Sequence, residues 1–222
     1  MKVELVGRTQ SVFKNENGPL TISEFLAMVA RVSNPSNQMN HETSPKLLSY
    51  CLRNGHWSVF ESASLTICIT TSIAIARQIL RHRSFTFQEF SQRYAESTTR
   101  EVYRARRKDN KNRQNSIDDL PESTRDWFIN AQFEAWELCY KLYMKAIKQH
   151  DIAPEQARFL LPVSTQTTLY VTGNIRSWIH YCEARCKNGV QLEHREIAEA
   201  CKQILLEEVP DLSDYFNGGK SV

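Results

Sequence analysis

Residues 65–94 read LTICITTSIAIARQILRHRSFTFQEFSQRY, and this stretch decides the fold. Its first part, residues 65–70, alternates apolar and polar side chains, which is typical of a strand with one buried face. Ser72 can then cap a short apolar helix over residues 73–79, and this helix leads to the charged run Arg81–Arg83. Since a strand that leads directly into a helix is a rigid support, we expect a functional site at the far end of the helix.

The second part of the stretch carries polar side chains suited to recognising a ligand. The run Arg81–Arg83 fans out by about 100° per residue on a helix and alternates sides in a strand, so in both cases it reaches more than one anionic group. Glu89, Ser91 and Arg93 recur at every second residue, which aligns them on one side if the segment is extended. At this point a structural interpretation is equally open, because Arg-rich helix ends are ordinarily solvated.

Length and composition predict one domain that spans residues 1–222. A hydrophobic content of 41% and a charged content of 24% are ordinary for a globular protein of this size. The net charge of +3 does not by itself predict binding to nucleic acid or to a membrane. No apolar run approaches the roughly 18 residues of a membrane span, and residues 1–6 are too short and polar for a signal peptide. We therefore expect a cytoplasmic protein.

The cysteines favour the same compartment. None of the six belongs to a CxxC pair, and each lies in an apolar periodic segment, as reduced core thiols do in the cytosol. Cys182, Cys186 and the nearby His180 lack the second close pair of ligands that zinc sites usually have. We therefore predict no metal site.

The rest of the chain is mostly helical. Helices are predicted over residues 22–32, 44–54, 124–150, 154–161, 174–186 and 193–208, and further strands over residues 2–6 and 165–172. In these elements Thr21 and Glu24 are expected to form a capping box, Ser44 to be an N-cap, and Asn54-Gly55 to close its helix as an αL cap. Gly173 is expected to end its strand, and His194 and Arg195 to lie in solvent. Helices with a few strands between them predict the α+β class, with a tail over residues 211–222.

Two further segments have more than one interpretation. The helix at residues 124–150 carries two apolar stripes, which predict burial on more than one side in an oligomer or a central position. Arg100–Arg113 holds seven Lys or Arg and two acids without apolar periodicity, so it is expected to be a solvated loop or hairpin tip. Nucleic-acid binding by this loop and the Arg81 cluster is the rival functional hypothesis, and it predicts strong salt dependence.

The motif Arg81-His82-Arg83 followed by Glu89-x-Ser91-x-Arg93-Tyr94 resembles the signature of flavin-dependent thymidylate synthases, R-H-R-x-x-S-x-N-E-x-S-x-R-Y. Thr86 and Gln88 depart from it, but they keep a hydroxyl and an amide. The resemblance covers most of residues 21–208, with supporting blocks at residues 56–61, 76–78, 157–162, 174–176, 185 and 191–193. A catalytically inactive relative is the third hypothesis, although Glu89, Arg158 and Arg185 are intact.

The resemblance implies a fold, an activity and an assembly. The fold is a single α+β domain with a small antiparallel sheet. The family converts dUMP to dTMP, with 5,10-methylenetetrahydrofolate as the carbon donor and NADPH as the reductant, and its hydride comes from bound FAD. The subunits are expected to form a homotetramer with shared active sites.

The resemblance also assigns site residues. The dUMP set is Gln78, Ile79, Leu80, Arg81, Glu89, Phe90, Ser91, Gln92, Arg93, Arg158 and Arg185. The FAD set is Ser58, Arg81, His82, Arg83, Glu89, Asn174, Ile175, Arg176 and His180. Arg185 is the expected catalytic residue, because an arginine that stays charged can favour the anionic uracil ring. Arg81 and Glu89 occur in both sets, which is consistent with contributions from different subunits.

Overall fold

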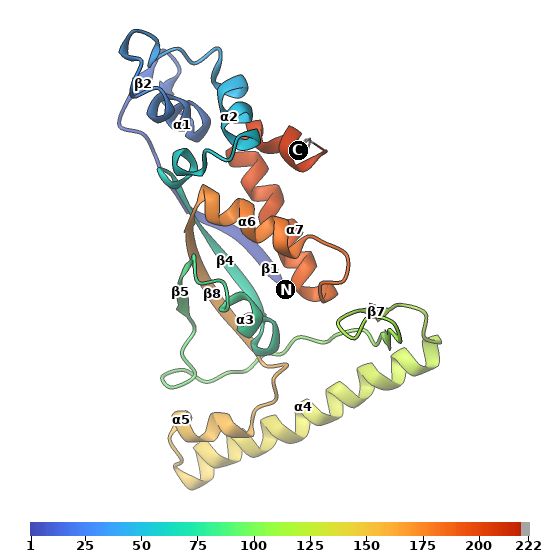
Figure 1. Cartoon of the computed structure of the whole chain (residues 1–222). Coiled ribbons are helices and arrows are strands. Elements are labelled where there is room, and N and C mark those ends of the chain that lie inside the picture. The colour runs from blue at the N-terminus through green and yellow to red at the C-terminus, as the bar shows by residue number, and fades with distance from the viewer. Residues whose placement is uncertain (219–222) are drawn as a thin grey trace.

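The computed structural model of the chain describes residues 1–218 and is built around a four-stranded antiparallel sheet (Figure 1). The strand order is β1-β4-β8-β5. The strands are β1 (Lys2–Arg8), β4 (Ser64–Ser72), β8 (Gln166–Asn174) and β5 (Thr86–Glu89). The central pair, β4 and β8, is in register over nine positions. The predicted α+β class with a small antiparallel sheet is therefore confirmed.

Helices cover one face of this sheet and extend beyond it (Figure 1). The longer ones are α1 (Ile22–Ala30), α2 (Ser44–Arg53), α3 (Ile73–Ile79), α4 (Glu122–His150), α6 (Ile175–Arg185) and α7 (Leu192–Glu208). Short elements are β2 (Lys14–Asn15), β3 (Gly18–Pro19), η1 (Pro35–Asn37), η2 (Trp57–Glu61), β6 (Arg107–Lys108), β7 (Ser116–Ile117), α5 (Pro154–Ala157), η3 (Arg158–Leu160), η4 (Pro210–Leu212) and α8 (Ser213–Phe216). Residues 219–222 of the predicted tail lie outside the described residues.

The main core lies between the sheet and helices α6 and α7. Leu65, Ile67 and Ile69 of β4 are fully buried, as their alternation predicted, and they share one cluster with Trp178 of α6 and Ile197 of α7. Complete burial of such aliphatic side chains contributes roughly 2 kcal/mol each. This core holds α6 against the sheet and so determines where the end of α6 lies.

Several predicted caps are present. Thr21 Oγ1 accepts a hydrogen bond from the Glu24 amide at 3.2 Å, and the Glu24 carboxylate accepts one from the Thr21 amide at 2.8 Å, which completes a capping box. Ser72 Oγ accepts from the Ile75 amide at the start of α3. Gly55 has a φ of 68°, the left-handed conformation predicted for the residue that follows α2.

Four local expectations were wrong. Ser44 is the first residue of α2 rather than its N-cap, which is Thr43. Strand β8 continues through Gly173, because pairing with Leu65 of β4 persists to the end of the sheet. His194 is fully buried, because its ring makes hydrogen bonds inside the protein and lies on the core side of α7. Helix α1 also ends at Ala30 rather than at residue 32.

Helix α4 extends away from the sheet along one side of the molecule (Figure 1). One side of its C-terminal half packs against α5 through the buried Tyr143 and Ala146. The other predicted apolar stripe is open in the single chain: Trp127 is 66% exposed and Leu138 is 61% exposed. Burial on both sides of α4 therefore does not occur within one chain.

The close approach at Gly173 provides a test of the core. A methyl group at this position would overlap with the buried Phe85 ring. We expect Gly173→Ala to lower the free energy of unfolding by about 1–3 kcal/mol, which urea titration would measure. Gly7→Ala is the matched control, because its methyl group would meet Thr66 Cβ only at an ordinary 3.4 Å. Equal stability of the two variants would show that the packing at Gly173 has no such restriction.

Candidate active site

A cleft of about 710 Å³ lies between the end of α3, the segment after β5 and the η3 turn. Six residues of the predicted dUMP set line it, namely Leu80, Glu89, Phe90, Ser91, Gln92 and Arg158. The structure thus brings together side chains from two parts of the chain about 70 residues apart, and the volume suits a small ligand. Arg77 and Thr167 also line the cleft, and sequence reasoning missed both.

Local contacts position the charged groups of this cleft. Thr167 Oγ1 donates to Glu89 Oε1 at 3.0 Å, which orients the carboxylate. Arg158 uses Nε to donate to the Glu155 carbonyl oxygen at 3.1 Å, so its terminal nitrogens keep their donors. Arg93 instead forms an ion pair with Glu155 at 3.3 Å. Arg158 is therefore better placed than Arg93 to offer positive charge to a ligand here.

The expected alignment of Glu89, Ser91 and Arg93 along one extended edge was wrong. Strand β5 ends at Glu89, and the chain then turns, with Ser91 Oγ accepting from the Arg93 amide at 3.4 Å. Thr86 and Gln88, the two departures from the motif, both lie exposed on β5.

A second group of predicted residues meets at the C-terminal end of α6. Arg185 Nε donates to His82 Nε2 at 2.8 Å, although 103 residues separate them. Burial, and then the positive charge of Arg185, lowers the pKa of His82 to about 4. His82 is therefore neutral at pH 7, and its Nε2 lone pair is the hydrogen-bond acceptor that holds the guanidinium.

Next to this pair lies the buried His194, which sequence reasoning missed. Its Nδ1 lies 3.2 Å from Gln78 Oε1, and its Nε2 lies 3.1 Å from the Tyr181 hydroxyl. Burial, followed by the charge of Arg185 and by repulsion between the protonated forms of the two histidines, lowers the pKa of His194 to about 4. A sequence signal existed, because His194 precedes Ile197 by three residues and shares its helix face.

The residues assigned to FAD fall into two kinds. Arg81 and Arg83 are exposed, and neither forms an ion pair within residues 1–218. Ser58 is exposed on η2, beside which Arg176 of α6 pairs with Glu61.

The remaining assigned residues differ in how far their side chains are used by contacts within the protein. The ring centroids of His180 and Trp57 lie 4.7 Å apart. Asn174 Oδ1 accepts from the Ser177 amide and so caps α6. Ile79 of the dUMP set and Ile175 of the FAD set have side chains buried in the core, so only their backbone can contact a ligand.

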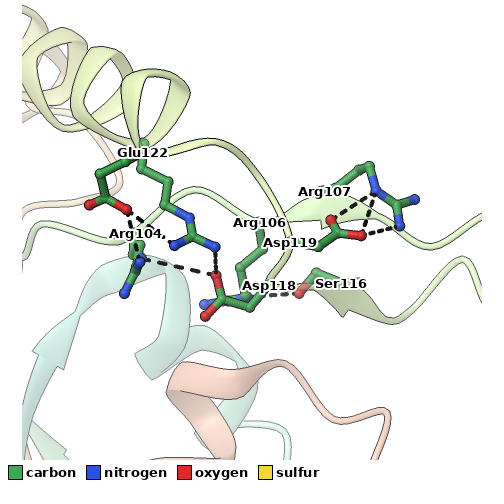
Figure 2. Close-up of polar contacts among 8 residues, drawn as sticks. Arg104, Arg106, Arg107, Ser116, Asp118, Asp119 and Glu122 are labelled. Carbon is green, nitrogen blue, oxygen red and sulfur yellow. Dashed lines mark hydrogen bonds and ion pairs between the residues drawn. The ribbon is translucent and has the colours of Figure 1, made fainter.

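The basic segment 100–113 is partly neutralised by ion pairs inside the chain (Figure 2). Arg104 pairs with Glu122 at 3.2 Å, and Arg107 pairs with Asp119 at 2.6 Å. Arg106 pairs with Glu193, and the Arg100 guanidinium lies 4.5 Å from the centroid of the Phe133 ring. Since four of the seven cations have such partners, the segment offers less positive charge to a polyanion than its sequence indicates.

The described residues contain neither a cluster of metal ligands nor a membrane-spanning helix. Within residues 1–218, no group of three or more His, Cys, Asp or Glu side chains is arranged to hold a metal ion. In the same part of the chain, no helix combines the length and apolar character that crossing a membrane requires.

Comparison with known proteins identifies the family. The family model described as "Thymidylate synthase complementing protein" matches residues 20–211. The probable flavin-dependent thymidylate synthase of Paramecium bursaria Chlorella virus 1 is 48% identical over 214 residues, which cover 96% of this chain and 97% of the viral protein. The chain belongs to the flavin-dependent thymidylate synthase family. The resemblance found in the sequence is therefore confirmed.

A second relative and a solved structure are also similar to this chain. The flavin-dependent thymidylate synthase of Synechocystis is 48% identical over 213 residues, with 96% of this chain and 98% of that protein covered. The crystal structure of the UMP/dUMP methylase PolB from Streptomyces cacaoi, bound with 5-Br dUMP, superposes with a TM-score of 0.81 at 25% identity. That match covers 97% of this chain and 94% of the methylase.

The two neutral histidines make stability depend on pH. In the unfolded chain their pKa returns to about 6.5, so unfolding takes up protons between pH 6.5 and pH 4 and stability falls as pH is lowered through this window. For the fully buried His194 the loss by pH 4 is roughly 3 kcal/mol. Urea unfolding at several pH values should show that His194→Asn reduces this pH dependence. An unchanged slope in that variant would contradict the prediction.

Proposed function

We propose that the enzyme methylates dUMP to dTMP, with 5,10-methylenetetrahydrofolate as the carbon donor, NADPH as the reductant and FAD as the bound cofactor. The observation that carries the proposal is the cleft lined by six residues of the predicted dUMP set. It combines a carboxylate, Glu89, with the partly free guanidinium of Arg158, and so offers partners both for sugar hydroxyls and for a phosphate.

The remaining charged groups fit FAD. A dinucleotide carries a pyrophosphate, and the unpaired, exposed Arg81 and Arg83 supply the charge that it needs. Ser58 and His180 add polar groups near the start of α6. Bound FAD would supply the hydride that the reduction requires.

Arg185 is proposed to activate the uracil ring. The C5 atom becomes nucleophilic when negative charge develops in the ring, and a planar cation near the ring oxygens and N3 stabilises that charge. One Arg185 donor is held by neutral His82, so the guanidinium plane is oriented and its terminal nitrogens keep their donors. Because His82 is neutral, it adds no positive charge that would repel Arg185. In this arrangement His82 is a positioning residue for Arg185.

We further propose a homotetramer with shared active sites. The predicted dUMP set is divided between the cleft, which contains Glu89 and Arg158, and the α6 end, where Gln78 and Arg185 lie in a polar network. Joining the cleft of one subunit to the α6 end of another would complete the set. The open apolar side of α4 supplies a surface that a second copy of the chain would cover.

The activity proposal is tested with the purified protein and an Arg185→Ala variant. The wild type should show a flavin absorption band that bleaches with NADPH, and it should form dTMP from dUMP and methylenetetrahydrofolate. Arg185→Ala should retain flavin but lose about 10²–10³-fold in kcat, because the donor to the ring is removed.

Arg113→Ala is the matched control, since Arg113 is an exposed arginine that lines no part of the cleft. Full turnover by Arg185→Ala would sink the role given to that residue. A wild-type protein that neither contains nor takes up FAD would sink the proposed activity.

The assembly is tested on α4. Leu138→Arg places a charge in the open apolar stripe, and we expect it to shift the protein from tetramer to smaller species in sedimentation experiments. Asn130→Arg is the matched control, because Asn130 is exposed on the polar side of the same helix. The role of α4 would be refuted if Leu138→Arg sedimented like the wild type.

A further inference from the structure

A chain of polar side chains connects the β6–β7 hairpin to Gln78, and its members are buried or half-buried except for the exposed Gln191. Arg106, just before β6, donates Nε to Ser116 Oγ of β7 at 2.8 Å (Figure 2). Its Nη2 lies 2.7 Å from the Glu193 carboxylate at the start of α7. The Arg106 side chain is 12% exposed and that of Glu193 is 8% exposed, so this ion pair differs from the open pairs elsewhere in the hairpin.

The chain continues through two amides. Gln191 Nε2 lies 3.0 Å from Glu193 Oε2, and Gln191 Oε1 lies 2.6 Å from Gln78 Nε2. Gln78 Oε1 lies 3.2 Å from His194 Nδ1, and His194 Nε2 lies 3.1 Å from the Tyr181 hydroxyl. Four contacts in series thus join the Arg106–Glu193 ion pair at the hairpin to a tyrosine in the core.

The Glu193 carboxylate at one end of this series of side chains determines the direction of every hydrogen bond in it. An ionised carboxylate can only accept, so Gln191 must donate to Glu193 with its nitrogen and accept with its oxygen. Gln78 must then donate to Gln191 with its nitrogen, which leaves its oxygen to accept from His194 Nδ1–H. The neutral His194 has one acceptor left, Nε2, which takes the hydroxyl proton of Tyr181. Reversing any amide would place donor against donor or acceptor against acceptor.

We propose that Arg106 and Glu193 are positioning residues that fix the amide orientation of Gln78, so that Gln78 presents its remaining N–H to an acceptor atom of the nucleotide. This inference rests on the proposed function, because it takes Gln78 as a dUMP-binding residue. The Oε1 atom of Gln78 and one of its two N–H groups are already used inside the protein. The ligand atom that meets the free N–H is therefore a hydrogen-bond acceptor.

Arg106 keeps the direction of the chain because its guanidinium holds the Glu193 carboxylate, whose oxygen accepts the hydrogen bond of Gln191. A buried carboxylate without a cationic partner favours protonation, and its O–H would then be a donor. A donor at position 193 would let the side-chain amide of Gln191 flip. The amide of Gln78 would then flip with it or lose its hydrogen bond to Gln191. Gln78 would then present oxygen in place of N–H to the nucleotide.

The test compares Arg106→Met with Arg107→Met in the flavin-loaded protein. Arg107 belongs to the same hairpin and pairs with Asp119, outside the chain to Gln78, so its removal controls for a weakened hairpin. For Arg106→Met we expect the KM for dUMP to rise about tenfold, the loss of roughly one hydrogen bond, with kcat and flavin content changed less than about twofold. Arg106→Lys should restore part of the affinity, and Arg107→Met should leave the KM unchanged.

Two further measurements separate orientation of Gln78 from a structural role. Gln78→Ala should raise the KM for dUMP about as much as Arg106→Met does, and Arg106→Met/Gln78→Ala should raise it no further, because Arg106 acts through Gln78. Calorimetric binding of dUMP to the oxidised protein measures the same affinity without turnover. If Arg106→Met does not fold, Glu193→Gln alone should raise the KM.

Each outcome decides the inference. An unchanged KM in a folded Arg106→Met protein overturns it, and so does an equal rise in Arg106→Met and Arg107→Met, which would indicate hairpin stability alone. Absence of dTMP formation by the wild type would overturn the proposed function instead. The two failures are therefore distinguishable.

Discussion

The rest of the structure depends on the in-register antiparallel pairing of β4 with β8. Their nine paired positions run from Ser64 opposite Asn174 to Ser72 opposite Gln166. The residue that ends each strand also caps the helix that follows, since Ser72 caps α3 and Asn174 caps α6. A shift of the register by one residue would turn the core face of both strands outward and move both helix starts. The sheet therefore determines the separation and direction of α3 and α6.

This arrangement explains how a short charged motif becomes a site. The chain beyond α3 brings His82 to the last turn of α6, where Arg185 Nε donates to it at 2.8 Å. Burial keeps His82 and His194 neutral, so Arg185 is surrounded by rings that accept or donate hydrogen bonds without adding charge. A single oriented cation in partly desolvated surroundings acts more strongly on a developing anion than the same group would in water.

The residues assigned to dUMP lie in two separate places in the chain. The cleft beside Glu89 and the polar network around Gln78 are built from neighbouring parts of one motif, yet they belong to different packing environments. The basic segment takes part in the polar network around Gln78 through the ion pair of Arg106 with Glu193, and not by presenting exposed positive charge. Large apolar side chains on α4, such as those of Trp127 and Leu138, are exposed in the single chain.

The sequence by itself determined the class, the family and most of the elements. Alternation at residues 65–70, the Thr21 capping box and the left-handed Gly55 are local signals, and each has the predicted conformation. The 14-residue motif and its supporting blocks identified the family, because functional side chains at fixed spacings are readable without coordinates. Several residues assigned to the nucleotide also lie in one cleft.

Only the tertiary structure decided which polar groups are buried and which of them meet. His194 was predicted to be solvated, and only packing against α6 places its ring in the core. Strand β8 continues through Gly173 because the backbone there stays paired with β4. The neighbouring Phe85 ring leaves room only for a residue without a side chain. The contacts from Arg185 to His82 and from Gln78 to Gln191 join residues over 100 positions apart. Such contacts depend on the sheet register and on desolvation, which local sequence patterns do not encode.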